Sequence, residues 1–266
     1  MFPVIDTHCH IYPDKIAQKA ANGIGQFYDI GMNFDGRLDT LKTVSAKAHV
    51  THSVIFSVAT TPRQVRSINS FIAENVANSG GRFTGLGAMH PDSEDMEGDI
   101  AQILALGLKG VKLHPDVQAF PIDDERGRHI CELCEKHRLP LLLHCGDYRY
   151  DYSNVNRLKP ILEDYKDLQV IGAHFAGWSV WESAAEALHG YDNLVVDSSS
   201  TFHWVDRAAA KHLISLYSTD RILFGSDFPM WDPKDELAFW EGLRLQDADY
   251  EKVFYKNAQK MFDISL

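Results

Sequence analysis

The amino-acid sequence predicts an α/β fold in which strands and helices alternate along the whole chain. The 266 residues contain eight strand-like runs, and a helical pattern follows each of them. Many of these runs are apolar without alternation, which is typical of strands that are buried on both faces. Strict alternation favours parallel pairing with right-handed crossovers, and about 33 residues per unit (266/8) suits a closed eight-stranded barrel. The sequence therefore predicts a (β/α)8 TIM barrel.

The order of the elements supports one barrel domain over residues 1–266. The strand-like runs are Val4–His10, Ser53–Val58, Phe83–Met89, Gly110–His114, Leu141–His144, Leu168–His174, Asn193–Asp197 and Arg221–Asp227. Helical patterns lie near residues 37–49, 62–76, 93–107, 124–137, 154–165, 178–188 and 203–217, and two further helices form a C-terminal extension. A doubly wound open sheet is the alternative, but no Gly-x-Gly-x-x-Gly turn follows the first strand.

Residues 11–36 interrupt this regular order, because they separate the first strand from its helix. Pro13, Gly23, Gly25, Gly31 and Gly36 make the stretch irregular in sequence. Long excursions inside compact domains are often lids or binding loops. We therefore expect a long loop over the site after the first strand.

The charge balance restricts the classes of partner. The chain has 26 Lys and Arg against 37 Asp and Glu, which gives a net charge of −11. This balance argues against nucleic acid and against an anionic membrane surface. No apolar run approaches the length of a membrane span, and the first residues enter a strand without the layout of a signal peptide. A cytoplasmic protein that acts on a small molecule is expected.

The cysteines give no sign of a disulfide framework. Cys131 and Cys134 match the C-x-x-C spacing of a redox pair or of half a zinc site. They lie within a helical pattern, however, and no second such pair exists in the sequence. We interpret both as helix packing. Cys9, which lies between two histidines on a strand, is expected to face away from them.

Polar residues that bind metals recur at the ends of the predicted strands. His8 and His10 close the first strand and share one face of it, because side chains alternate along a strand. The other strands end in Lys112 and His114, His144, His174, Asp197 and Asp227, and the steps from 114 to 144 and from 144 to 174 are each 30 residues. The carboxyl ends of barrel strands converge on one face. The spacing therefore predicts a metal site there.

These motifs resemble the amidohydrolase superfamily, in particular the branch that includes aminocarboxymuconate-semialdehyde decarboxylase. The matching motifs are Asp6-Thr-His-Cys-His10, Gly110-Val-Lys-Leu-His-Pro115, Pro140-Leu-Leu-Leu-His144, Gly172-Ala-His174 and Leu223-Phe-Gly-Ser-Asp-Phe-Pro229. The resemblance runs from residue 4 to about residue 262 and so covers nearly the whole chain.

The resemblance implies roles for the matching residues. His8, His10, His144 and Asp227 would be metal ligands, and His174 would stand beside the metal-bound water. Asp227 and His174 are thus the expected catalytic residues, with Asp227 taking the proton of the attacking water. Three imidazoles and one carboxylate suit one Zn²⁺ ion, with Mn²⁺, Fe²⁺ or Co²⁺ as alternatives. The resemblance also implies a homodimer.

The number of ions depends on the strand that ends in Lys112 and His114. Some branches of the superfamily bridge two ions with a carboxylated lysine or a glutamate at this position, and Lys112 leaves that alternative open. The branch that this chain resembles uses one ion, which is the expectation here. Lys112 is otherwise expected to bind a substrate carboxylate, and His114 to contact substrate or to form a hydrogen bond in the loop.

Three residues on the following loops are candidates for substrate binding. Arg149 lies five residues after His144, where a guanidinium can hold a carboxylate by two hydrogen bonds. A surface salt bridge is the alternative for Arg149. Trp178 and His203 follow two later strands and are expected to form walls of the pocket.

The expected function is a metal-dependent hydrolase that cleaves a C–N or C–O acyl bond in a small carboxylated substrate. Decarboxylation or hydration of an unsaturated or aromatic acid is the main alternative, because it needs the same metal site. A TatD-like nuclease would want an acidic residue in place of Lys112 and a more basic groove. A non-catalytic metal-binding protein would not need His174.

Overall fold

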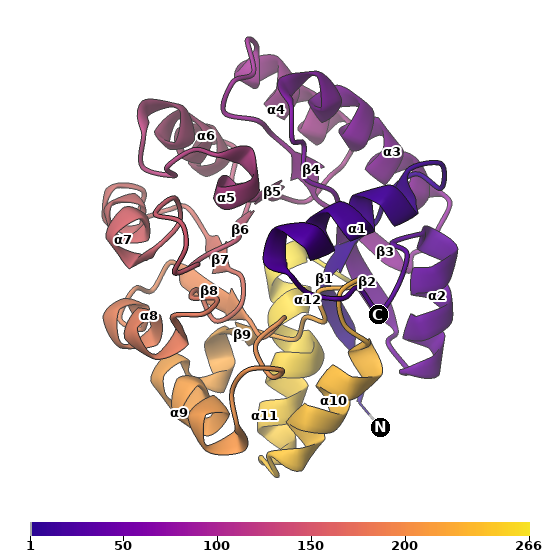
Figure 1. The fold of residues 1–266 in the computed structure, drawn as a ribbon, viewed down its shortest axis with the longest axis vertical. Helices are drawn as coiled ribbons and strands as arrows, with labels where there is room; N and C mark the ends of the chain where they lie inside the picture. The colour runs from indigo at the N-terminus through magenta and orange to yellow at the C-terminus, as the bar shows by residue number, and fades with distance from the viewer. Residues whose placement is uncertain (1) are drawn as a thin grey trace.

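The strands of the protein form a parallel barrel that is surrounded by helices (Figure 1). The computed structural model describes residues 2–266. The strands are β1 (Ile5–His10), β2 (His52–Phe56), β3 (Phe83–Gly85), β4 (Gly87–Ala88), β5 (Val111–Leu113), β6 (Leu141–Leu143), β7 (Val170–Gly172), β8 (Leu194–Asp197) and β9 (Ile222–Leu223). The predicted run Phe83–Met89 supplies both β3 and β4, which are separated by Leu86. The eight predicted runs therefore correspond to these nine short strands.

Hydrogen bonds between backbone groups carry the sheet around the barrel. Strands β1 to β3 form one parallel group and β4 to β9 form another. The amide of Leu86 donates to the carbonyl of Ile55 at 3.0 Å and links the two groups. On the other side, the amide of Thr7 donates to Phe224 O at 2.9 Å, and the amide of His10 donates to Phe228 O at 2.7 Å. These bonds join β1 to the segment after β9.

The helices lie around the strands, and several of them pack against their sequence neighbours. They are α1 (Ala17–Tyr28), α2 (Leu38–Lys47), α3 (Val65–Ala77), α4 (Met96–Ala105), α5 (Pro115–Gln118), α6 (Glu125–Lys136), α7 (Val155–Asp164), α8 (Trp181–Leu188), α9 (Arg207–Tyr217), α10 (Pro233–Gly242), α11 (Asp247–Glu251) and α12 (Asn257–Phe262). A 3₁₀ turn at Pro62–Gln64 precedes α3, and a π-helical turn at Lys252–Lys256 joins α11 to α12. None of the helices in the described part of the chain is long and apolar enough to cross a membrane.

The C-terminal extension fills the end of the barrel opposite the predicted site. Ala258 and Phe262 of α12 belong to one buried cluster with Ile5, Leu142 and Leu223, which are strand residues. This end of the barrel is therefore a packed apolar core. The carboxyl ends of the strands remain as the face on which a ligand can enter.

The stretch after the first strand differs from the expectation of an irregular loop. Residues 17–28 form a helix of 12 residues, α1, despite Gly23 and Gly25. Gly25 is needed for packing, because a Cβ there would lie 2.7 Å from the carbonyl oxygen of Ile30. Gly23 faces open space. The excursion is real, but its central part is a helix, because tertiary packing outweighs the low helix propensity of two glycines.

The cysteines lie where the sequence predicts them. Cys131 and Cys134 are buried in α6, and all four cysteines of the chain are free thiols. Cys9 is fully buried in the main core cluster and does not join the histidines beside it.

Candidate metal centre and active site

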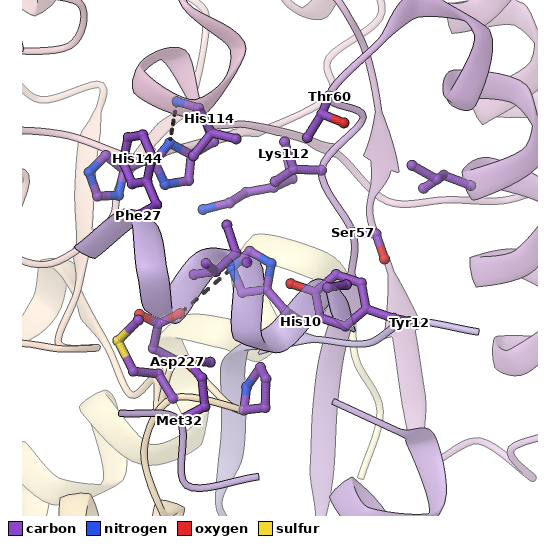
Figure 2. A pocket seen from close by; sticks show the side chains of 18 of the residues that line it. His10, Tyr12, Phe27, Met32, Ser57, Thr60, Lys112, His114, His144 and Asp227 are labelled. Carbon is purple, nitrogen blue, oxygen red and sulfur yellow. Dashed lines mark hydrogen bonds and ion pairs between the residues drawn. The ribbon is translucent and has the colours of Figure 1, made fainter. Parts of the chain in front are cut away.

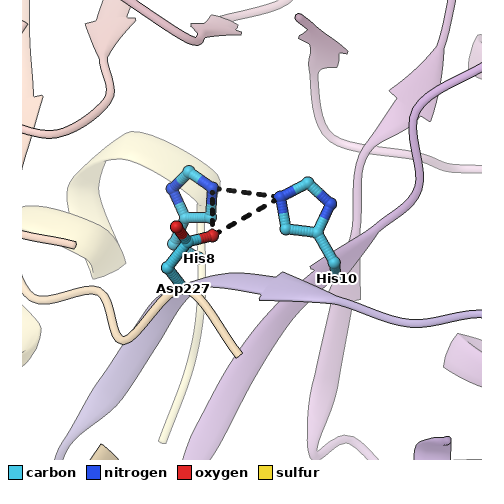
Figure 3. Close-up of side chains that lie close together, drawn as sticks. All are labelled: His8, His10 and Asp227. Carbon is cyan, nitrogen blue, oxygen red and sulfur yellow. Dashed lines mark hydrogen bonds and ion pairs between the residues drawn. The ribbon is translucent and has the colours of Figure 1, made fainter. Parts of the chain in front are cut away.

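Three side chains with metal-binding atoms meet at the carboxyl ends of β1 and β9 (Figure 3). The Nε2 atoms of His8 and His10 lie 3.3 Å apart. Asp227 Oδ1 lies 3.3 Å from His8 Nε2 and 3.6 Å from His10 Nε2. The structure thus brings together three of the four predicted metal ligands, although they come from opposite ends of the chain.

The orientation of His8 is fixed by Asp197 at the end of β8. Asp197 Oδ2 lies 2.8 Å from His8 Nδ1, and Asp197 is fully buried. A carboxylate can only accept here, so His8 donates through Nδ1 and keeps a lone pair on Nε2. Burial opposes the ionisation of Asp197, but its electrostatic interaction with His8 and the hydrogen bonds that it accepts from His8 and Ser199 outweigh burial and hold the pKa of Asp197 well below its usual range.

Asp227 is also held by neighbouring hydroxyl groups. Ser200 donates its hydroxyl hydrogen to Asp227 Oδ2 at 2.5 Å, which leaves Oδ1 to face the two histidines. The backbone of Asp227 has a left-handed conformation with a φ of 63°. Ser226, the residue before Asp227, is anchored to β1, because it donates to Asp6 through its amide, at 2.9 Å, and through its hydroxyl, at 2.5 Å. Such held backbone outliers are typical of functional sites.

The chemistry of these three side chains fits a divalent metal ion. Two imidazole nitrogens and a carboxylate oxygen converge, and the other nitrogen of His10 is buried without a hydrogen-bond partner. Burial outweighs the nearby carboxylates and lowers the pKa of His10 well below its usual range, so its imidazole is neutral and can donate a lone pair. A site with two histidines and one carboxylate suits Zn²⁺ and also Fe²⁺ or Mn²⁺.

His174 stands next to this group at the end of β7. Its ring centroid lies 5.2 Å from that of His8. Its Nδ1 lies 2.9 Å from the carbonyl oxygen of Ser199, which can only accept, so His174 carries its hydrogen on Nδ1. Burial lowers the pKa of His174 to about 4. His174 is therefore neutral, and its lone pair is on Nε2, which lies 3.1 Å from His144 Nδ1.

His144, the fourth predicted ligand, lies on the far side of His174. Its Nδ1 is 3.1 Å from His174 Nε2, and its Nε2 is 3.3 Å from Asp116 Oδ2. The structure groups His144 with His114 and Asp116, and not with the pair on β1. His144 is thus not part of the group formed by His8, His10 and Asp227.

The group of His114, Asp116 and His144 is linked to α1 by a tyrosine. The rings of His114 and His144 stack with centroids 4.0 Å apart. The Tyr28 hydroxyl lies 2.8 Å from His114 Nε2 and 3.3 Å from His144 Nε2. Burial and the neighbouring charge of Asp147 raise the pKa of Asp116 to about 8. The protonated form of Asp116 can donate to His144 through Oδ2, whereas Asp116 Oδ1 is buried without a hydrogen-bond partner.

Lys112 enters the site from β5, with its side chain inside the barrel. Its Nζ lies 3.4 Å from His8 Nε2 and 5.2 Å from the centre of the Phe56 ring. Burial lowers the pKa of Lys112 to about 8. Lys112 and His114 are two residues apart, and both line the same cavity.

A single cavity connects these groups with solvent (Figure 2). Its volume is about 750 Å³. Polar side chains at the strand ends form its floor, namely His8, His10, Lys112, His114, His144, His174 and Asp227. Apolar side chains of α1, α3 and the intervening loops form much of the remainder, and Trp178 is part of the wall as predicted.

Arg149 is not one of the cavity-lining residues, which corrects its predicted substrate contact. Its guanidinium bonds to the buried carboxylate of Asp147 at 2.7 Å and to the carbonyl oxygen of Phe27 at 2.8 Å. It also lies 5.2 Å from the ring centres of Phe27 and Tyr28, and near the ring of Trp178. A salt bridge is thus the better description, although its carboxylate is buried and not at the surface as expected. The contacts of Arg149 tie the end of α1 to the loop after β6.

His203 is likewise absent from the cavity wall. Its ring stacks on that of Trp231 with centroids 3.6 Å apart, and its Nε2 lies 2.8 Å from Glu236 Oε1. Glu236 is buried, and burial raises its pKa to about 7. The expectation that His203 forms a wall of the pocket is therefore corrected to a contact with α10.

Several residues that shape the site have no role in the predictions from sequence. Asp197 was noted only as a strand end, whereas it fixes His8. Ser199 and Ser200 lie two and three residues after Asp197 and hold His174 and Asp227. Their proximity to a strand end was the available signal. No feature of the sequence assigned Tyr28 to the site, because the helix that carries it was not predicted.

The sequence matches the amidohydrolase family over residues 5–264. The chain therefore belongs to this family, and it is an enzyme of the amidohydrolase superfamily. A comparison with curated proteins finds no match.

Solved structures share the fold at low sequence identity. An uncharacterised TIM-barrel protein from Bordetella bronchiseptica has 19% identity and a TM-score of 0.78, over 98% of this chain and 99% of that one. A dihydroxybenzoic acid decarboxylase from Polaromonas with bound manganese and 2-nitroresorcinol has 16% identity and a TM-score of 0.73, over 99% and 97%. A putative 2-pyrone-4,6-dicarboxylic acid hydrolase from Pseudomonas putida has 17% identity and a TM-score of 0.69, over 100% and 99%. These similarities establish the TIM-barrel fold.

Proposed function

We propose that this enzyme is a metal-dependent hydrolase that cleaves a C–N or C–O acyl bond, in an amide, lactone or ester. The observation that carries the proposal is the convergence of His8, His10 and Asp227, with a second base, His174, beside them. Hydrolysis needs a held water, a proton acceptor and a stabilised oxyanion. The floor of the cavity offers groups for each of these needs.

The resident ion would be held by His8, His10 and Asp227, and His144 is the proposed fourth ligand. One zinc ion is the favoured occupant, and Mn²⁺, Fe²⁺ or Co²⁺ are the alternatives. A bound divalent ion supplies Lewis acidity, which lowers the pKa of a water molecule and polarises a substrate oxygen. The neutral imidazoles and the ionised carboxylate are the forms that bind such an ion.

The proton of the attacking water passes to the protein. Asp227 Oδ1 faces the two histidines and accepts this proton, while Ser200 steadies the other carboxylate oxygen. His174, whose ring centroid lies 5.2 Å from that of His8, is proposed to share the role of base through Nε2. The proton then moves to the leaving amine or alkoxide as the acyl bond breaks.

Lys112 is the proposed contact for a carboxylate on the substrate. With Arg149 bound to Asp147, Lys112 is the cation that remains on the floor of the cavity. Its ammonium group lies close to the proposed ligands, so it would place the substrate carboxylate beside the scissile bond. His114 is proposed to contact substrate from the next position along the same face.

The direct test is turnover by metal-reconstituted enzyme on a panel of amides, lactones and esters. Protein loaded with one equivalent of Zn²⁺ or Mn²⁺ should release acid from at least one class of substrate. Metal-free protein should be inactive, and re-addition of the ion should restore the rate. A fully loaded protein that turns over none of the three classes would refute the proposal.

Non-oxidative decarboxylation is the second candidate, because similar structures include decarboxylases and the apolar walls would suit an aromatic acid. The same ion and the same Asp227 would serve that reaction. Release of CO₂ without a hydrolytic product would favour it over hydrolysis. Incubation of the loaded enzyme with aromatic acids, followed by measurement of CO₂, separates the two reactions.

A further inference from the structure

The cavity has a polar floor and an extended apolar upper part. The floor consists of the histidines, Lys112 and Asp227 at the strand ends. The upper part lies against α1 and α3, where most of the lining side chains are aliphatic or aromatic. The proposed reaction at the ion uses only the floor, so the apolar part calls for its own explanation.

One face of α1 forms the roof of this apolar part. Ile16, Ala20, Ile24 and Phe27 all line the cavity, and their spacing places them on one stripe of the helix. From Ile16 to Phe27 the chain advances by eleven residue steps (27 − 16), which measure about 16 Å at about 1.5 Å per residue. At the end of the stripe, Tyr28 bonds to His114 on the floor. The stripe is thus much longer than the reacting group of a small substrate.

The side of the apolar part is formed by α3 and is open to solvent. Ile68 and Phe71 of α3 are both half-buried and both line the cavity. Ile16, at the start of the stripe on α1, is 51% exposed. Large apolar side chains are thus kept at the mouth of the cavity, where burial by a ligand would stabilise them.

The size of the cavity agrees with a ligand that is longer than its reacting head. Its volume of about 750 Å³ lies in the upper part of the range of roughly 300–1,000 Å³ found for pockets that enclose drug-sized ligands. A single-ring acid bound to the floor would leave the walls on α1 and α3 in contact with water. Such walls favour an apolar occupant.

We propose that the natural substrate is an acyl compound with an extended apolar group, which lies beneath α1 and reaches Ile68 and Phe71. This inference rests on the proposed function, because the acyl carbon is placed at the ion. In the reaction, water adds its hydroxyl to the acyl carbon, the C–O or C–N bond breaks, and the second hydrogen of water goes to the leaving group. The product is an apolar carboxylic acid.

The test uses linear monocarboxylates as product analogues, from acetate to octanoate, with calorimetric titration of the zinc-loaded protein. If the alkyl chain enters the apolar part, each added methylene should tighten binding by about fourfold, from about 0.8 kcal/mol per buried methylene. Removal of the zinc should weaken all members of the series by a similar factor. The slope against chain length therefore reports the apolar part, and the loss without zinc reports the metal head.

Two variants of α1 locate the chain. Ala20→Phe fills the cavity from the roof and should abolish the slope, so that octanoate binds no better than butanoate. Asn22→Phe adds the same ring on the exposed side of α1, away from the cavity, and should keep the slope. Circular dichroism with and without zinc checks that both variants fold.

The outcomes separate this inference from the proposed function. A flat series in the wild type, or a slope that survives Ala20→Phe, would overturn the apolar substrate. A slope that is lost in Ala20→Phe and kept in Asn22→Phe supports it, whether or not zinc changes the affinity. Binding that is the same with and without zinc would instead count against the proposed metal head.

Discussion

The floor and the roof of the cavity are built in opposite ways. On the floor, two of the proposed ligands are each held by a second residue that lies at or just after the end of β8: His8 by Asp197, and Asp227 by Ser200. The roof is one helix outside the regular repeat, and its C-terminal end is tied down by Arg149 and Tyr28. In our proposal, the floor holds the reacting groups in position, and the roof selects the substrate.

This difference predicts how substitutions should act. Changes on the floor should affect the ion or the turnover number, because they alter groups that touch the reacting atoms. Changes on the roof should affect substrate affinity and local mobility, because they alter a helix that covers the cavity. The following experiments test this division, from the largest expected effect to the smallest.

The largest effect is expected for Asp227→Asn, which removes both a ligand charge and the proposed base. Turnover should fall by about 10⁴-fold, and the purified protein should carry less ion. Elemental analysis together with kcat measures both effects. Asp235→Asn, on the exposed face of α10, is the matched control and should change neither. An Asp227→Asn variant with full metal content and normal turnover would contradict the role of the floor.

His174→Asn should separate catalysis from metal binding. His174 is not a proposed ligand, so the variant should keep its ion while turnover falls by about 10² to 10³-fold. The ion content and kcat of the same preparation decide the matter. Loss of the ion in this variant would mean that His174 is a ligand.

Asp197→Asn tests whether the hydrogen bond between Asp197 and His8 contributes to metal binding. The amide can no longer hold His8 through a carboxylate, so metal affinity should fall by about 10- to 100-fold. Competition with a chromophoric chelator measures the affinity. Turnover at saturating zinc should change less than the affinity does. An unchanged affinity would show that His8 needs no such partner.

The smallest effect is expected for Arg149→Lys on the roof. Lysine keeps the charge beside the buried Asp147 but loses the two-pronged bond and the stacking on the rings of Phe27 and Tyr28. Amide hydrogen exchange in residues 17–28 should accelerate by about tenfold, and KM should rise while kcat stays nearly constant. A variant with a lower kcat and unchanged exchange would place Arg149 in the chemistry.

The sequence was sufficient to predict the barrel and the strand-end residues, and the reason is periodicity. Side chains alternate between the two faces of a strand, and the last residues of all the parallel strands lie at the carboxyl end of the barrel. This places His8, His10, His174 and Asp227 on one face without any knowledge of the loops. The position of a residue in its strand does not determine which neighbours its side chain contacts, and His144 is found beside Asp116.

Residues in the loops do not follow the alternation of a strand, and the predictions for the loops were less accurate. Arg149 and His203 were assigned to the pocket from their place after a strand, but each binds a nearby buried carboxylate. The helix α1 was not predicted, because Gly23 and Gly25 have low helix propensity and obscure its apolar stripe. Only the packed structure shows that these glycines are tolerated, since Gly25 packs closely and Gly23 faces open space.

The central claim is that the enzyme acts through an ion held by His8, His10 and Asp227. The most direct measurement is the metal content of active enzyme, determined with its turnover before chelation, after chelation and after re-addition of Zn²⁺ or Mn²⁺. We predict one ion per chain, loss of turnover with loss of the ion, and recovery on re-addition. A His8→Ala and His10→Ala double variant should retain no ion. Full turnover by metal-free protein would contradict the claim.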